Sequence, residues 1–244
     1  MKNRGVLCHF GIIVLGLWLT GCATPRIMTD PAYQERPALE TSLFRGDQDF
    51  ASEDAVQKIL SGRVVLPPKA KVAILKYDGT DADRLAVAYY GYYYWRSEAY
   101  IKLQQEFLDT VQSKLLSSGR VSEAAALPSL LVPKQPTISM LRQAGVRLQA
   151  DLLLVYRVTS DVYYEFHLFT KDEVKAYSTV EAVLLDVRTG IIPFTSIATK
   201  DLLTQRLSKE VDREEAMKRA QKDATIMSLL TVCNDLTTFL KKVP

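Results

Sequence analysis

The stretch Asp151-Leu-Leu-Leu-Val-Tyr-Arg-Val158 decides the fold of this chain. A short and almost continuous apolar run of this kind is typical of a β-strand that is buried on both faces. Such a strand lies inside a sheet, with other strands on its edges and helices against its faces. The residues on either side of it must therefore supply those strands and helices.

Two more strands are predicted on the C-terminal side of this run. Residues 180–187 form the first strand, and residues 191–200 return as the second. Between them, Arg188-Thr189-Gly190 has the composition of a hairpin turn. Strands joined by so short a turn pair antiparallel with each other, so these residues extend the sheet.

The N-terminal side supplies two further strands, and helices follow between and after them. Lys71-Val-Ala-Ile-Leu-Lys-Tyr77 is a β-rich run that ends at Asp78-Gly79, and a short strand begins at Val121. Cap residues or apolar residues of helical period predict helices over residues 53–61, 97–118, 137–148 and 212–242. The last helix has too continuous an apolar side for a helix surrounded by solvent, so we expect it in the core.

These elements predict the fold class α/β (α+β), as a single mixed sheet with helices packed on it. The expected order is β-α-β-α-β-β-β-α, with a long C-terminal helix. We assign residues 51–244 to one domain, because about 190 residues suffice for one hydrophobic core and are few for two.

The N-terminal residues have the pattern of a secretory signal peptide. Lys2 and Arg4 precede an apolar stretch from Val6 to Leu19, and small residues follow. The apolar stretch is shorter than the roughly 18 residues that cross a bilayer as a helix. We therefore expect residues 1–21 to be removed.

Leu19-Thr20-Gly21-Cys22 resembles the lipobox of bacterial lipoproteins. The resemblance implies that the Cys22 thiol receives diacylglycerol, that a peptidase cuts before Cys22, and that a fatty acid such as palmitate acylates the new amino group. Ala23, where aspartate would retain such a protein in the inner membrane, implies the outer membrane, with the domain facing the periplasm. Residues 22–50, rich in proline and polar residues, are expected to be a flexible tether. The alternative is an ordinary signal peptide that happens to end in Gly-Cys.

Charge and cysteine content exclude several classes of protein. The chain has 31 basic and 28 acidic residues, and loss of Lys2 and Arg4 with the signal peptide leaves 29 and 28. Such a balance does not indicate a nucleic-acid-binding protein. With Cys22 carrying lipid, Cys233 is the only other cysteine after the signal peptide, so no internal disulfide forms. We expect Cys233 to be a buried small hydrophobe.

The residues that usually carry catalysis are scarce. His167 is the only histidine after the signal peptide, which excludes a multi-histidine zinc site or a serine–histidine–aspartate triad. Asp78, Asp81 and Asp83 lie close together, but the glycine and glutamate of a calcium-binding loop are missing. We therefore expect no enzyme activity, no cofactor and no metal ion.

An aromatic segment, Tyr89-Tyr-Gly-Tyr-Tyr-Tyr-Trp95, is the unusual feature of the chain. In an extended conformation both of its faces would be aromatic, although one face suffices to complete a core. Tyr92, Tyr94 and Trp95 are therefore our candidate partner-binding residues. The alternative is that these rings lie between two layers of the fold or cover an edge of the sheet.

The order of elements, together with four local motifs, resembles a group of bacterial envelope proteins. The motifs are the first strand at 71–77, Gly119 after a helix, Ala150-Asp151 before the central strand, and the hairpin Asp186-Val187-Arg188-Thr189-Gly190. The group contains the curli-secretion lipoprotein, the amino-terminal domain of the translocation protein TolB, and lipoprotein activators of peptidoglycan synthases. The rhombotarget lipoproteins share the same frame.

This resemblance implies a non-enzymatic, lipid-anchored outer-membrane protein that faces the periplasm and binds a protein partner in envelope assembly or secretion. The alternative is a subunit of an oligomeric outer-membrane secretion channel. Residues 161–177 alternate in polarity and would then form a membrane hairpin, but they are short for that role and their return is charged. A lengthened hairpin of the soluble domain is the simpler interpretation. The sequence names neither the partner nor the oligomeric state.

Overall fold

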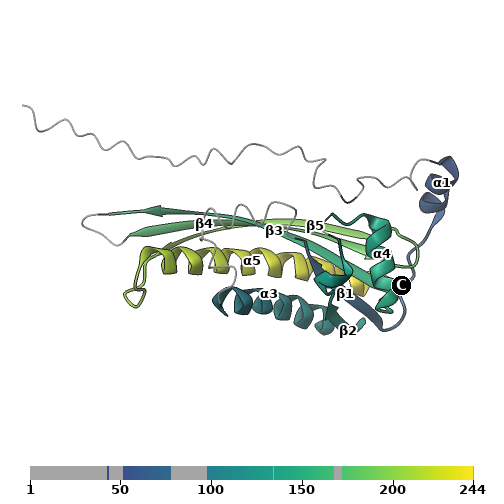
Figure 1. Ribbon diagram of the computed structural model, residues 1–244, viewed down its shortest axis with the longest axis horizontal. Coiled ribbons are helices and arrows are strands. Elements are labelled where there is room, and N and C mark those ends of the chain that lie inside the picture. Colours follow the sequence, from purple (N-terminus) through teal and green to yellow (C-terminus); the bar gives the residue numbers. More distant parts are fainter. Residues whose placement is uncertain (1–42, 44–51, 78–97, 134, 168–171, 244) are drawn as a thin grey trace, which may run out of the picture. The chain divides into compact units, whose positions relative to one another are not determined.

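The computed structural model describes residue 43 and residues 52–77, 98–133, 135–167 and 172–243. All of them belong to the unit Pro37–Pro244. Its strands form one sheet in the order β2-β1-β3-β4-β5 (Figure 1). The strands are β1 (Ala70–Lys76), β2 (Val121–Ala126), β3 (Leu152–Glu165), β4 (Glu173–Asp186) and β5 (Phe194–Gln205). The helices are α1 (Glu53–Ser61), α3 (Glu98–Ser117), α4 (Ile138–Arg147) and α5 (Arg213–Lys242), with a 3₁₀ turn η4 (Ser129–Leu131).

Strand β3 lies in the middle of the sheet, as the sequence predicted. β1 pairs with it in parallel, with Val72 opposite Leu152, and β4 pairs with it antiparallel along its whole length. β2 is the parallel neighbour of β1 at one edge, and β5 is the antiparallel neighbour of β4 at the other. The predicted fold class and order of elements are thus confirmed.

Three strands are longer than predicted. β3 continues beyond Val158 to Glu165, β4 begins at Glu173 and not at Val180, and β5 continues to Gln205. Apolar and polar residues alternate in these extensions. Alternation is typical of a strand that packs against other elements with one face only. The continuous apolar runs mark only the parts of the strands that are buried on both faces. The alternation in residues 161–177 had indicated the lengthened hairpin that β3 and β4 form.

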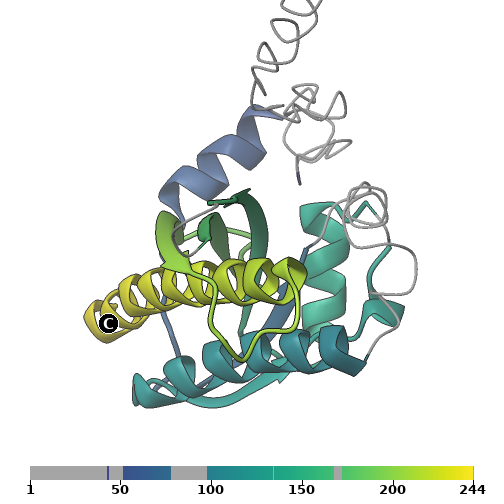
Figure 2. The ribbon, with the colours of Figure 1, turned by 90° about the vertical axis from the view of Figure 1, so that its left-hand side faces the viewer.

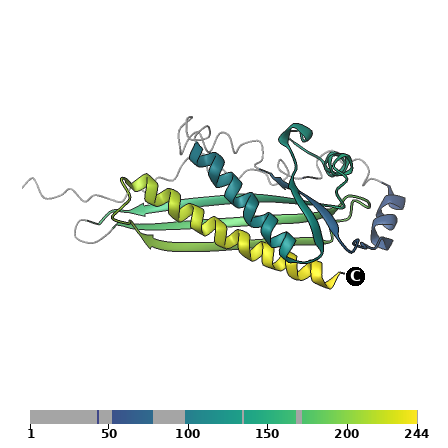
Figure 3. The same ribbon diagram turned by 90° about the horizontal axis from the view of Figure 1, so that it is seen from below.

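Helices α3 and α5 lie side by side on one face of the sheet (Figures 2 and 3). Even-numbered residues of β3, such as Leu152 and Leu154, point toward them. The helical side of this core consists of Phe107, Val111, Leu115, Leu229, Val232, Cys233, Leu236 and Leu240. The C-terminal helix is therefore part of the core, as expected.

The first half of α5 packs on the extended part of the β3–β4 hairpin. The contact is made by small or branched apolar side chains, namely Ala216, Ala220, Ala224, Val162, Val174 and Ala176. The three alanines recur every four residues along one side of the helix and are fully buried. Residues 161–165 and 173–177 thus direct their apolar side at α5, as expected for a lengthened hairpin of the domain.

Helix α4 covers the opposite face of the sheet, at the end near β1 (Figure 1). Thr137 caps the helix, because its hydroxyl accepts a hydrogen bond from the Met140 N–H. Leu43, from the predicted tether, packs against the same cluster, and its carbonyl accepts from the Ile138 N–H at 3.2 Å. Beyond α4, no described element covers this face of β3, β4 and β5.

The hairpin turn between β4 and β5 has the predicted position. The Asp186 carboxylate accepts hydrogen bonds from the Arg188 N–H at 3.1 Å and from the Thr189 hydroxyl at 2.5 Å. Gly190 follows with a φ of +80°, which a residue with a side chain adopts only with strain. Arg188 also forms an ion pair with Asp151 at 2.7 Å, which links the turn to the start of β3.

Candidate functional site

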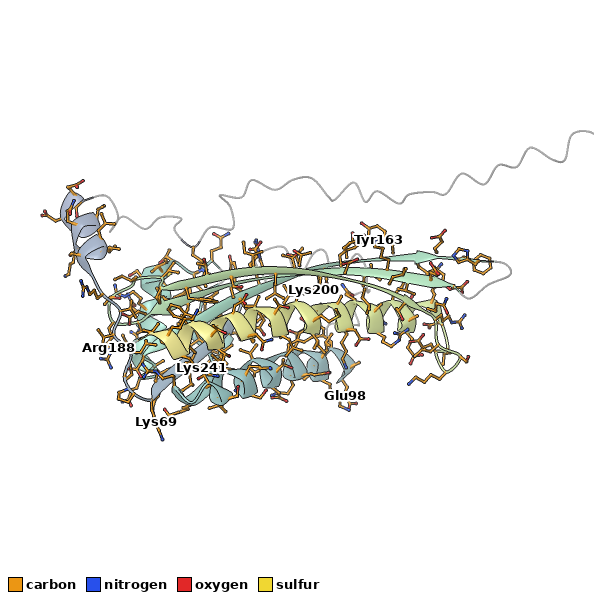
Figure 4. All side chains as sticks on the ribbon, turned by 180° about the vertical axis from the view of Figure 1, so that it is seen from behind. Lys69, Glu98, Tyr163, Arg188, Lys200 and Lys241 are labelled. Atoms are coloured by element: carbon orange, nitrogen blue, oxygen red, sulfur yellow. The ribbon has the colours of Figure 1, made fainter. Side chains whose placement is uncertain are left out.

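The side of β3, β4 and β5 that no described element beyond α4 covers is the candidate site, and we call it the open face. Its side chains come from alternate residues of each strand, whose chain neighbours point toward α5. In cross-strand rows, the open face consists of Arg157, Glu181 and Ile197; Thr159, Thr179 and Thr199; Asp161, Tyr177 and Asp201; Tyr163, Lys175 and Leu203; and Glu165, Glu173 and Gln205. Figure 4 shows Tyr163 on the side of the sheet away from α5.

Large apolar side chains are exposed on the open face. Ile197 is 72% exposed, Leu203 is 60% exposed and Tyr163 is 54% exposed. Tyr163 and Leu203 belong to the same row, on either side of Lys175. Ile197 lies three rows away from them. Single exposed apolar residues are common, whereas apolar side chains grouped on a surface with polar residues around them are a feature of interaction sites.

The tyrosines near the centre of the open face are held by contacts among themselves and with charged groups. The Tyr163 ring meets the Tyr177 ring edge to face at 6.0 Å, and its hydroxyl donates to Asp161 at 2.7 Å. Lys175 Nζ lies 5.0 Å from the centroid of the Tyr177 ring. The side-chain interaction with Tyr177 raises the pKa of Lys175. These contacts restrict the positions of both rings, and side chains that are already restricted lose less entropy when they bind.

The open face carries more negative than positive charge. Arg157 Nη2 donates to Glu181 Oε2 at 2.7 Å, so this pair is neutral as a whole. The remaining charged side chains are Lys175, Asp161, Glu165, Glu173 and Asp201. An acidic surface of this kind favours a partner with basic groups.

One end of the open face is the tip of the β3–β4 hairpin. The Tyr164 hydroxyl donates a short hydrogen bond to Asp172, and the other Asp172 oxygen accepts from the His167 N–H at 3.1 Å. The bond between the two side chains raises the pKa of Tyr164 and lowers the pKa of Asp172. Beside them, Glu165, His167 and Glu173 each bring one possible metal-ligand atom within 4.8 Å of the other two.

The site residues predicted from the sequence lie outside the described residues. This holds for the lipidation candidate Cys22 and for the partner-binding candidates Tyr92, Tyr94 and Trp95. They stay predictions. Asp78, Asp81 and Asp83, which follow the first strand and lack the pattern of a calcium-binding loop, lie outside the described residues as well.

Cys233 has the predicted environment. It is a free thiol buried under the sheet, and burial raises its pKa to about 12. A thiol that stays protonated is a poor nucleophile and a poor metal ligand. Its role is therefore packing.

Neither the open face nor the group of side chains at the hairpin tip was predicted from the sequence. The alternation of polar residues through 157–165 was a usable signal for the open face. Glu165 and His167 are two positions apart, which places them on one side of an extended chain. The participation of Glu173 depends on the hairpin register, which no local pattern reveals.

Within the described ranges, no helix is both long and apolar enough to cross a membrane. No family model matches the chain. No curated protein matches it either.

The solved structures that match this chain do so with low sequence identity and low TM-scores. A minor lipoprotein from Acinetobacter baumannii is 12% identical, with a TM-score of 0.34 over 72% of this chain and 92% of that one. A lipoprotein from Neisseria meningitidis is 11% identical, with a TM-score of 0.29 over 69% and 99% of the two chains. The PelC dodecamer from Paraburkholderia phytofirmans is 16% identical, with a TM-score of 0.26 over 75% and 91%. Likenesses of this size assign neither a family nor a function to this chain.

Proposed function

We propose that this chain is a lipoprotein of the outer membrane that acts, without catalysis, by binding a protein partner in envelope assembly or secretion. The observation that carries the proposal is the open face. It exposes Tyr163, Ile197 and Leu203, although α5 covers the other side of the same strands. A domain that needed only stability would gain from covering these apolar side chains as well.

The lipobox supports the membrane anchor in this proposal. Acyl chains at Cys22 would contribute about 0.8 kcal/mol per buried CH₂ group, so that two or three chains hold a protein firmly on a bilayer. Residues 22–50 would then link the lipid to the domain. Because the domain faces the periplasm in this arrangement, the partner is an envelope protein.

The chemistry of the open face indicates what the partner presents. Fixed tyrosine rings and exposed aliphatic side chains suit an apolar centre, since aromatic anchors carry much of the energy of protein interfaces. The carboxylates of Asp161 and Asp201 flank Tyr177 in one row. The partner therefore presents apolar side chains surrounded by lysine or arginine.

Site-specific photo-cross-linking in intact cells tests the proposal. A photoreactive residue at position 197 or 203 should give a discrete protein adduct, whereas the same residue at position 101 should not. Ile101, which is 62% exposed on α3, is the matched control because it is an exposed aliphatic residue away from the open face. Equal adducts from all three positions, or none from the open face, would contradict the proposal.

Charge reversal gives a second arm of the same test. Asp161→Lys together with Asp201→Lys should weaken the adduct from position 197 several-fold, because it removes the attraction for a basic partner. Glu98→Lys with Glu214→Lys, at exposed sites on the helices, is the control and should leave the adduct unchanged. An equal yield of adduct in both double variants and in the parent protein would show that the contact does not use the acidic surface.

A further inference from the structure

We propose that the tip of the β3–β4 hairpin binds one divalent transition-metal ion of the zinc class through Glu165, His167 and Glu173. One ligand atom of each side chain lies within 4.8 Å of the other two, and this is the one such group in the described part of the chain. This inference does not depend on the proposed function.

The register of the hairpin creates the site. Glu165, the last residue of β3, is directly opposite Glu173, the first residue of β4. His167 lies two residues beyond Glu165, and its Nε2 is 4.0 Å from Glu165 Oε1. The pairing of β3 with β4 therefore brings an imidazole and two carboxylates to the same place, with His167 and Glu165 from the end of β3 and Glu173 from the start of β4.

The two carboxylates at the tip favour the binding of a cation. Two carboxylates directly opposite each other on a sheet repel and destabilise the pairing. Among the described residues, no lysine or arginine forms an ion pair with Glu165 or Glu173. An ion between the carboxylates converts this repulsion into attraction for both.

The kind of donor atoms selects the metal. Carboxylates alone suit magnesium or calcium, whereas an imidazole nitrogen favours zinc and its neighbours among the transition metals. Zinc binds histidine nitrogen and carboxylate oxygen at about 2.0–2.2 Å, so two ligand atoms on one ion are at most about 4.4 Å apart. The Glu165 side chain is exposed, so a small change in its torsion angles suffices to close the distance that remains.

A hydrogen-bonded support positions the histidine. The Asp172 carboxylate accepts from the His167 backbone N–H at 3.1 Å and from the Tyr164 hydroxyl. Tyr164 in turn packs against the apolar cluster between the hairpin and α5. The backbone at His167 is thus tied to the rigid part of the domain, and a ligand held in this way loses less freedom on binding an ion.

Titration of the purified protein with ZnCl₂ tests the site by calorimetry. The sample is residues 22–244, with Cys22→Ser and no polyhistidine tag. We expect saturable binding of one ion per chain. His167→Gln and Glu173→Gln should each lower the affinity at least about tenfold, since even the loss of a supporting residue costs 10–100-fold at metal sites. Asp201→Asn, which removes another exposed carboxylate of the open face, should bind like the parent protein.

Magnetic resonance gives a readout that does not depend on any variant folding. His167 is the only histidine in residues 22–244, so its ring protons give a single, assigned set of signals. One equivalent of zinc should shift these signals, and MgCl₂ at the same concentration should not. Zinc binding that leaves the ring signals unchanged, binding equally strong in all variants, or no saturable binding would each overturn the proposal.

Discussion

Arg219 Nε lies 2.5 Å from Oε1 of Glu210, and this ion pair joins the loop after β5 to helix α5. The Glu210 side chain is almost fully buried and also accepts from the Leu207 N–H at 2.7 Å. Arg219 uses a second nitrogen to donate to the Gln205 carbonyl at 2.9 Å. The pair therefore fixes where α5 begins relative to the end of the sheet.

The stability of the protein should depend on pH through Glu210. Arg219 lowers the pKa of the Glu210 carboxyl, so the pair stabilises the fold above the pKa of an unfolded glutamate, about 4.3. This contribution is lost as the pH falls through the lower folded pKa. Between about pH 5 and about pH 3, the free energy of unfolding in urea should fall more steeply in the wild type than in Glu210→Gln. Glu214→Gln, which changes an exposed carboxylate, should keep the wild-type slope; a Glu210→Gln slope equal to wild type would refute the assignment.

Ala220→Leu should destabilise the domain by about 1–3 kcal/mol, because a larger side chain has no room between α5 and the hairpin. Ala220 is fully buried against Val174 and Ala176. Urea unfolding followed by circular dichroism measures the loss. Thr238→Leu, at an exposed position of the same helix, should change stability by less than about 0.5 kcal/mol. If the two variants were equally stable, the close packing of α5 on the hairpin would be wrong.

Cys233 should not react with a thiol reagent in the native protein. Burial both blocks access and raises its pKa to about 12, so almost no thiolate exists at pH 8. In a chain with Cys22→Ser that starts at residue 22, one thiol should react after denaturation in urea and none before. Rapid reaction of the native protein would place Cys233 at the surface.

Cys22 should carry the lipid. Mass spectrometry of the mature protein should find a diacylglyceryl-modified, N-acylated Cys22 as the first residue, and Cys22→Ser should leave the precursor uncut or the product without lipid. With Ala23 next to it, the protein should fractionate with the outer membrane. An unmodified Cys22 at the mature terminus would refute the anchor, whereas inner-membrane fractionation would refute the sorting alone.

Substitutions in the aromatic segment test whether its rings contribute to partner binding or to the folded core. Replacing Tyr92, Tyr94 and Trp95 by serine should weaken partner binding and leave the melting temperature unchanged if these rings form a recognition surface. The melting temperature and the cross-linked adduct from position 197 are measured on the same variant. A melting temperature lower by many degrees would assign the rings to the core and end the binding interpretation.

The local patterns of the sequence predicted the secondary structure well, because caps and turns act over a few residues. Thr137 accepts a hydrogen bond from the first turn of the helix that follows it, as predicted, and Asp212, the predicted start of the last helix, does the same for α5. Gly190 closes the β4–β5 turn in the conformation that favours glycine. The continuous run at 151–158 identified the central strand, since burial on both faces leaves an unbroken apolar signal.

The sequence by itself thus determined the elements, their order and the apolar side of the last helix, all of which follow from periodicity within a segment. Only the tertiary structure decided where the open face lies, because that depends on α5 packing along one side of the long strands. It also decided that Glu165 meets Glu173 and His167 at the hairpin tip. A shift of one residue in the pairing would send each side chain to the opposite face of the sheet, and register arises from contacts between strands and not from either strand alone.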